Sequence, residues 1–261
     1  MTLKDGLWEG ASVAVVGGGP SLAGFDFTKL KNCTLAGAPA KVIAINGAIK
    51  ACPFADLWFT EDLRVVELYY KTSAWRAFDG LKVLHALSPS FAAKALDMDP
   101  SLTIISRKRQ DKFWSRTLAD GLSLSSNSGV GAINLAQILG AVWIYLLGFD
   151  CKVSNTGGAN FHDDYRKAHW DETGNAQFAS FKSDFEHWVE PHARSMKVIN
   201  LTPIDDPSAI ECWPRWDLKS FFSNGRPAEI IIPFAKQVPV RHTSSGSSWE
   251  ELWGEEVGAV T

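Results

Sequence analysis

Val13-Ala14-Val15-Val16-Gly17-Gly18-Gly19-Pro20-Ser21-Leu22 is the stretch that decides the fold of this 261-residue chain. Its apolar, mostly β-branched first half predicts a buried parallel strand. The three glycines allow the backbone to turn sharply and a ligand to come close to the main chain. Pro20 suits the first turn of a following helix, where its missing N–H costs nothing. Because a strand, a glycine turn and a helix N-terminus form an anion site, phosphate is the expected ligand.

The glycine turn matches neither of the two common phosphate-binding motifs. The dinucleotide fingerprint Gly-x-Gly-x-x-Gly would need a glycine where Leu22 stands, and no Gly-Lys-Ser/Thr follows as in a P-loop. A glycine-rich turn without a ligand is therefore the alternative, and other segments have to decide between the two interpretations.

Further apolar runs repeat the pattern of the first strand. Strands are expected at 41–48, 56–60, 81–87, 102–105, 142–147 and 196–201, with helical segments between most of them. Such alternation predicts a single α/β domain over 1–235, with a Rossmann-like, mainly parallel sheet and helices on both faces. Residues 236–261 are expected to form a polar tail with a short helix that contains Trp249 and Trp253.

Composition excludes several classes of protein. The net charge of −3 argues against a surface devoted to nucleic acid, although a local basic patch stays open. Four widely spaced cysteines without a C-x-x-C pair indicate reduced thiols and a cytoplasmic protein. No apolar run has the roughly 20 residues that a membrane span needs, and no signal peptide is visible. The sequence leaves the oligomeric state open, a homo-oligomer included.

Polar residues follow several predicted strands, and this is where open α/β sheets bind ligands. Asn46 follows the second strand and could read a ribose or a base through its amide. Glu61 and Asp62 follow the third strand and could contact a ribose hydroxyl or Mg²⁺, or cap the next helix instead. Residues 125–131 open a later helix and offer a second anion site, or a simple N-cap with packing glycines.

A long polar segment, 151–176, carries the candidate acid–base groups. His169 and His162 lie there, outside the apolar core pattern, and an imidazole titrates near neutral pH. A metal site of these histidines with Asp163 and Asp164 is conceivable from the residue types, but the spacing fits no known metal motif.

Four motifs in this order carry a family resemblance: 15–22 with Gly-Gly-Gly-Pro-Ser-Leu, 43–48 with Ile-Asn-Gly, 127–130 with Asn-Ser-Gly-Val, and 144–150 with Ile-Tyr-Leu-Leu-Gly-Phe-Asp. Over roughly residues 11–205 the chain resembles the 6-hydroxymethylpterin diphosphokinase (MptE-like) family, some members of which are carried by phages. More distantly it resembles the bacterial lipooligosaccharide sialyltransferases with a Rossmann-like fold. The sialyltransferases have asparagines where this chain has Gly18 and the Thr60-Glu61-Asp62 segment.

The resemblance implies a transferase and a distribution of roles. His169, or less well His162, would be the general base, and Asp62 or Glu61 would lie near the donor. The donor would be a nucleotide-sugar or ATP, the latter with Mg²⁺, and the acceptor a sugar or another hydroxyl compound. Glycosyl transfer, MptE-type diphosphate transfer and a non-catalytic nucleotide-binding module remain alternatives. Residues implied to hold the donor nucleotide are Gly17, Gly18, Gly19, Pro20, Ser21, Asn46, Asn127, Ser128 and Gly129.

Overall fold

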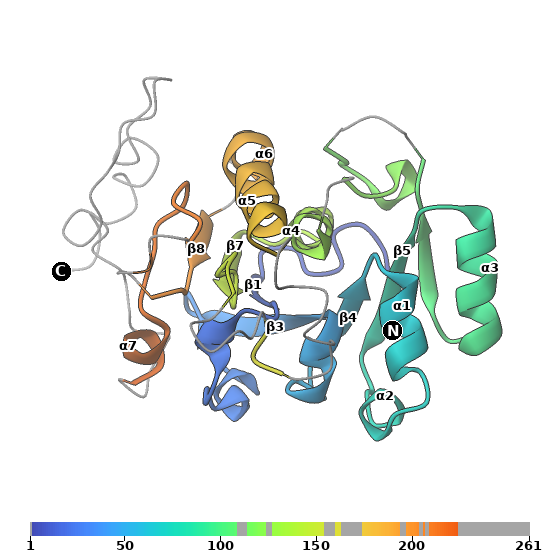
Figure 1. Ribbon diagram of the computed structural model, residues 1–261, viewed down its shortest axis with the longest axis horizontal. Coiled ribbons are helices and arrows are strands. Elements are labelled where there is room, and N and C mark those ends of the chain that lie inside the picture. Colours follow the sequence, from blue (N-terminus) through green and yellow to red (C-terminus); the bar gives the residue numbers. More distant parts are fainter. Residues whose placement is uncertain are drawn as a thin grey trace. The chain divides into compact units, whose positions relative to one another are not determined.

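A computed structural model describes residues 2–108, 114–123, 127–153, 160–162, 174–193, 197–203, 206 and 209–223. Its centre is an eight-stranded sheet (Figure 1). The strands are β1 (Ser12–Val16), β2 (Thr34–Leu35), β3 (Ala38–Ile45), β4 (Leu57–Thr60), β5 (Leu81–Ala86), β6 (Thr103–Ser106), β7 (Trp143–Leu147) and β8 (Lys197–Asn200).

The order of the strands creates one reversal in the sheet. Along the sheet they run β6-β5-β4-β3-β1-β7-β8, and every pair in this series is parallel. The chain moves outward from β1 through β3 to β6, then returns to β7 on the other side of β1. Ligands of open α/β sheets bind beyond the carboxyl ends of the strands at such a reversal. The predicted parallel, Rossmann-like sheet is confirmed, and its switch point lies between β1 and β7.

Helices cover both faces of the sheet, as expected. Right-handed crossovers put the helices of the outward and return paths on opposite faces, and Figure 1 shows α1–α3 apart from α4–α6. A π-helical segment, Asp184–Val189, joins α5 to α6. The helices are α1 (Leu63–Tyr69), α2 (Ser73–Arg76), α3 (Pro89–Met98), α4 (Ser128–Ile138), α5 (Gly174–Ser183), α6 (Glu190–Ala193) and α7 (Leu218–Ser223).

The α-helix that was expected directly after the glycine turn does not form. Only a three-residue 3₁₀ turn forms there, Pro20–Leu22, and Ala23 already leaves the helical region. Leu22 is fully buried and its N–H binds the Gly19 carbonyl, so the turn is fixed by packing and not by a following helix. The first motif therefore lacks the helix dipole that its sequence suggested. The hairpin of β2 with β3 was also not expected, because a two-residue strand carries no periodic signal.

One compact unit spans Met1–Ile230. The expected tail, 236–261, lies outside the described residues. All four cysteines lie in described segments and are free. None of the helices in the described ranges is long and apolar enough to cross a membrane.

Candidate functional site at the carboxyl edge of the sheet

The three glycines of the first motif are needed for close packing. None has a positive φ, but a β-carbon at Gly17 would lie 2.9 Å from the Gly148 carbonyl oxygen. At Gly18 it would lie 2.5 Å from Oδ1 of Asn160, and at Gly19 only 1.7 Å from Oδ2 of Asp150. The turn is thus pressed against the segment after β7 and against residues 160–162, whose Phe161 N–H donates to the Gly18 carbonyl over 2.8 Å.

Asp150 connects this turn to β7. Its Oδ2 accepts hydrogen bonds from the Ser21 hydroxyl at 2.9 Å and from the Ser21 N–H at 3.4 Å. The carboxylate is 1% exposed, and burial raises its pKa while the Ser21 hydrogen bonds oppose that shift. Two of the donors that were expected to hold a phosphate therefore bind a carboxylate of the protein itself.

Asn46 begins the turn after β3 in a left-handed conformation, with φ of +52°. Its Oδ1 accepts from the Thr60 hydroxyl at 2.7 Å, and its carbonyl accepts from the Trp58 indole at 2.8 Å. Asparagine is one of the few side chains that tolerate this backbone region. Among the described residues its Nδ2 has no hydrogen-bond partner, so the amide keeps the donor that base or ribose recognition needs.

His162 lies against the same turn. Its Nε2 would be 2.2 Å from a β-carbon at Gly47, and the Tyr69 hydroxyl would be 2.9 Å from that point. His162, in the long polar segment, therefore lies at the carboxyl end of β3. His169 lies outside the described residues.

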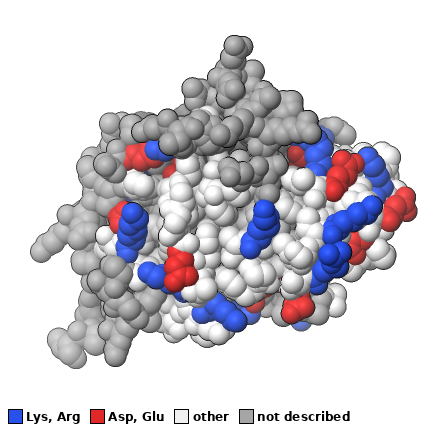
Figure 2. Space-filling view, turned by 60° about the horizontal axis from the view of Figure 1, so that its bottom comes forward, with Lys and Arg blue, Asp and Glu red and all other residues white. Residues whose placement is uncertain are grey.

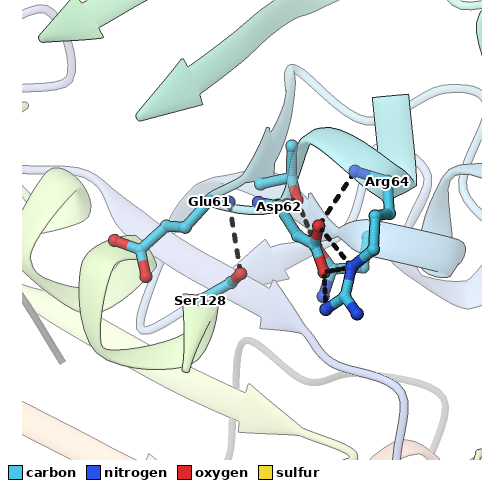
Figure 3. Close-up of polar contacts among 6 residues, drawn as sticks. Glu61, Asp62, Arg64 and Ser128 are labelled. Atoms are coloured by element: carbon cyan, nitrogen blue, oxygen red, sulfur yellow. Dashed lines mark hydrogen bonds and ion pairs between the residues drawn. The ribbon is translucent and has the colours of Figure 1, made fainter. Parts of the chain in front are cut away.

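Asp62 caps a helix instead of facing the edge. Its Oδ1 accepts from the Arg64 N–H at 2.9 Å at the start of α1, and its Oδ2 pairs with the Arg64 guanidinium at 2.7 Å. In Figure 3 this carboxylate points toward Arg64 and away from Ser128. Of the two roles that its sequence position allowed, capping is the one observed.

Glu61 points the other way, toward the first turns of α4 (Figure 3). Its N–H donates to the Ser128 hydroxyl over 3.3 Å, and its Oε1 lies 2.8 Å from Nδ1 of His85. Burial raises the pKa of Glu61, and His85 acts against that rise. The sequence analysis missed His85, although a histidine inside the apolar run 81–87 needs a buried partner.

The second glycine motif begins α4 beside both strands. Asn127 caps the helix by accepting from the Val130 N–H at 3.2 Å. A β-carbon at Gly129 would lie 2.8 Å from the ring of Phe149, and one at Gly17 would lie 3.3 Å from the same ring. The two predicted phosphate-binding segments thus lie on either side of Phe149. Since α4 has eleven residues, its first turn supplies the helix N-terminus that the Pro20–Leu22 turn lacks.

The described residues do not form a metal centre. No group of three or more histidine, cysteine, aspartate or glutamate side chains comes together among them. Of the two acids after β4, Asp62 is paired with Arg64 through both oxygens, and Glu61 contacts His85 through Oε1. A single carboxylate oxygen of Glu61 without further ligands nearby does not fit a Mg²⁺ ion held by the described part of the protein alone.

A separate cavity of about 590 Å³ lies at the other end of α4. Gln137 and Ile138 of the last turn of α4 line it. Trp114 and His192 also line it, and their rings are stacked with centroids 5.6 Å apart. None of the predicted site residues that the structure describes lines this cavity, so it is distinct from the carboxyl edge.

Comparison with known proteins adds no assignment. No family model matches the sequence, and no curated protein matches it either. The likeness to MptE-like proteins and sialyltransferases therefore stays a prediction, and the argument for function depends on the site itself.

Proposed function

We propose that this protein is a nucleotide-dependent transferase that moves a glycosyl group from a nucleotide-activated sugar to a hydroxyl acceptor. The main support for the proposal is that several polar segments come together at the carboxyl edge of the sheet. Segments after β1, β3, β4 and β7 and the start of α4 meet at the switch point of a parallel sheet. Ligands of open α/β sheets bind at this place.

The groups available at this edge suit a nucleotide. The first N–H groups of α4 and the Ser128 hydroxyl favour phosphate, because a helix N-terminus carries unpaired donors and partial positive charge. The Nδ2 group of Asn46 can donate to a base or a ribose. His162 stands beside the same turn, where an acceptor hydroxyl would approach the donor.

The engaged acids favour a metal-independent donor over Mg-ATP. Both carboxylate oxygens of Asp62 are hydrogen-bonded to Arg64, and these contacts have to break before Asp62 can bind Mg²⁺. MptE-type diphosphate transfer is therefore the second candidate, and it would need Asp62 to leave its cap.

Charge supports a small acceptor over a nucleic acid. Figure 2 shows Lys and Arg side chains interspersed with Asp and Glu on the face in view. Lys41 pairs with Asp56 at 2.8 Å, and Lys94 pairs with Glu67 at 2.5 Å. A nucleic-acid surface would instead gather unpaired cations on one face.

Calorimetric titration with CMP, CDP, UDP, ATP and GTP, each with and without Mg²⁺, tests the proposal. We expect metal-independent binding of one of the first three. The Ser128→Ala variant should bind about tenfold more weakly, because a hydrogen bond to a charged group contributes roughly 1.5–3 kcal/mol. Ser90→Ala on α3 is the matched control and should bind as the wild type does.

Three other results would change the conclusion. Binding that requires Mg²⁺ and ATP would favour diphosphate transfer. Binding without consumption of any activated donor would favour a nucleotide-binding module. If none of the five nucleotides binds, the nucleotide site at this edge is wrong.

A further inference from the structure

We propose that Glu61 is the group that takes the proton from the acceptor hydroxyl, and that His85 is the positioning residue that holds it. This inference rests on the proposed transferase function. It assigns the base to the end of β4, whereas the sequence resemblance pointed to a histidine of the 151–176 segment.

The two oxygens of Glu61 differ in their surroundings. Oε1 lies 2.8 Å from the His85 imidazole, whereas Oε2 has no hydrogen-bond partner among the described residues. The side chain is 10% exposed, so the carboxylate is not sealed within the core. Oε1 is therefore held by His85, and Oε2 is left to accept a proton beside the first turns of α4.

His85 has the features of a support and not of a reacting group. Its side chain is fully buried in β5, and the register that aligns Thr60 with Leu84 brings Glu61 beside it. When Glu61 is ionised its carboxylate only accepts hydrogen bonds, and the imidazole then donates from Nδ1. Its Nε2 is buried and has no hydrogen-bond partner in the described part of the chain. A substrate cannot reach this ring, but the ring fixes the carboxylate.

The helix above the pair leaves room for it. A β-carbon at Gly131 would lie 2.5 Å from Oε1 of Glu61, so only glycine lets α4 pass this close. The first two turns of α4 carry no titratable side chain, and the neighbouring Asp62 is paired with Arg64. Burial and His85 are thus what set the proton affinity of Glu61.

Burial of such a pair is costly to the fold. Desolvating a carboxylate and an imidazole, with one nitrogen left unpaired, loses more than a single hydrogen bond returns. Groups that serve the stability of the fold are expected to be fully satisfied. Unfavourable placement of this kind is typical of residues that carry function.

In the proposed step, the O–H bond of the acceptor breaks and its proton forms a bond with Oε2 of Glu61. The acceptor oxygen attacks the anomeric carbon of the donor. The bond between that carbon and the phosphate oxygen breaks, and its electron pair leaves with the nucleotide. General-base help of this kind contributes about 10²–10⁴-fold in rate.

The test compares Glu61→Gln, His85→Asn and His85→Ala with the wild type and with Glu67→Gln, a charge-removing control on the exposed side of α1. Three quantities are measured: nucleotide affinity by calorimetry, thermal stability at pH 7.5, and single-turnover release of nucleotide. The donors are CMP- and UDP-activated sugars and Mg-ATP, with glycerol as the hydroxyl compound.

Glu61→Gln should keep its nucleotide affinity and at least the thermal stability of the wild type, while release slows by about 10²-fold or more. The amide oxygen still accepts from His85 but binds no proton. His85→Asn should retain most of the rate, because its amide can donate from nearly the Nδ1 position. His85→Ala should lose about tenfold in rate with little change in affinity.

Each other outcome overturns the inference in a recognisable way. If Glu61→Gln turns over within about threefold of the wild type, Glu61 is not the base, and the transferase stands. If Glu61→Gln melts earlier and binds more weakly, the pair serves the fold. If the wild type consumes none of the donors, the transferase proposal fails, and this inference fails with it.

Discussion

Glu61 and Asp150 occupy equivalent places in the sheet, yet their surroundings differ. Each follows a parallel strand at the carboxyl edge, and burial raises the pKa of both. Oδ2 of Asp150 receives both the hydroxyl and the N–H of Ser21, which fastens the β1 turn to β7. Glu61 has only His85 as a hydrogen-bond partner for its carboxylate among the described residues.

The difference separates a structural acid from one available for chemistry. Asp150 binds the main chain of a turn in which glycines are required, so its loss should loosen the fold. Glu61 binds a single buried side chain and leaves one oxygen at the edge, so its loss should spare the fold. If this division holds, substitutions at the Asp150 contacts should lower the free energy of unfolding more than substitutions at Glu61 or on the surface.

Gly19→Ala should cause the largest loss in the free energy of unfolding. The new β-carbon would lie 1.7 Å from Oδ2 of Asp150 and 2.6 Å from the Gly148 carbonyl oxygen, so the turn must move. Overpacking of this kind costs about 3 kcal/mol of unfolding free energy. Urea denaturation followed by tryptophan fluorescence measures it.

Gly24→Ala is the control for backbone strain alone. Gly24 has φ of +74° but nothing within 4 Å of its β-position, so alanine there should cost about 1 kcal/mol. Equal losses for the two variants would contradict the close approach of Asp150 to the turn.

Ser21→Ala should have the next largest effect. It removes the 2.9 Å hydrogen bond to Asp150 and leaves a buried carboxylate with fewer donors. Hydrogen bonds to charged groups contribute about 2 kcal/mol, so the unfolding free energy should fall by that amount. In a double-mutant cycle with Asp150→Asn the two losses should not add. Additive losses would show that the two side chains act independently.

Glu61→Gln should change stability in a pH-dependent way. The pKa of Glu61 is raised above 4.5 in the folded state, so the folded protein holds this proton where the unfolded chain has released it. The stabilisation is complete below the unfolded pKa and is lost as the pH rises through the folded pKa. A glutamine side chain cannot be ionised, so the Glu61→Gln variant does not lose this stabilisation. Its free energy of unfolding relative to the wild type should therefore increase above pH 4.5, by up to about 1.4 kcal/mol per pH unit.

Denaturation at a series of pH values from 4 to 8 measures this difference. Asp150 titrates in both proteins and cancels from the comparison. A stability difference that stays constant with pH, or one that favours the wild type at pH 8, would show that Glu61 stabilises the fold as Asp150 does.

Glu67→Gln should have the smallest effect. Glu67 pairs with Lys94 at 2.5 Å, but both side chains are largely exposed. Exposed ion pairs contribute at most about 1 kcal/mol, and half of that is expected here. A larger loss would mean that contacts between α1 and α3 matter more to the fold than the carboxyl edge does.

The sheet could be predicted because its strands are short apolar runs that end in glycine or polar residues. All seven parallel strands correspond to such runs, and the signal is local. The prediction of an α-helix after Pro20 was wrong, because the contacts that decide this turn come from residues far away in the sequence. Leu22 packs into the core and Ser21 binds Asp150, so long-range contacts replace the helix that local propensity favoured.

The sequence predicts which residues lie at the ends of the strands, but it does not predict which of their side chains pair with each other. Asn46, Glu61 and Ser128 do come to one edge, because parallel strands all end there. Which acid turns inward depends on the register of β4 with β5, which places Glu61 and not Asp62 beside His85. Sequence spacing contains no information on that register.

Hydrogen exchange in the presence of nucleotide shows which segments of the protein bind it. Exchange of backbone amides is measured by mass spectrometry with and without millimolar CMP, CDP or Mg-ATP. A nucleotide bound at the carboxyl edge should protect the amides of 17–22, 46–50 and 127–131, the segments that meet there. Protection confined to 114–116 and 191–192, which line the cavity at the far end of α4, would contradict it.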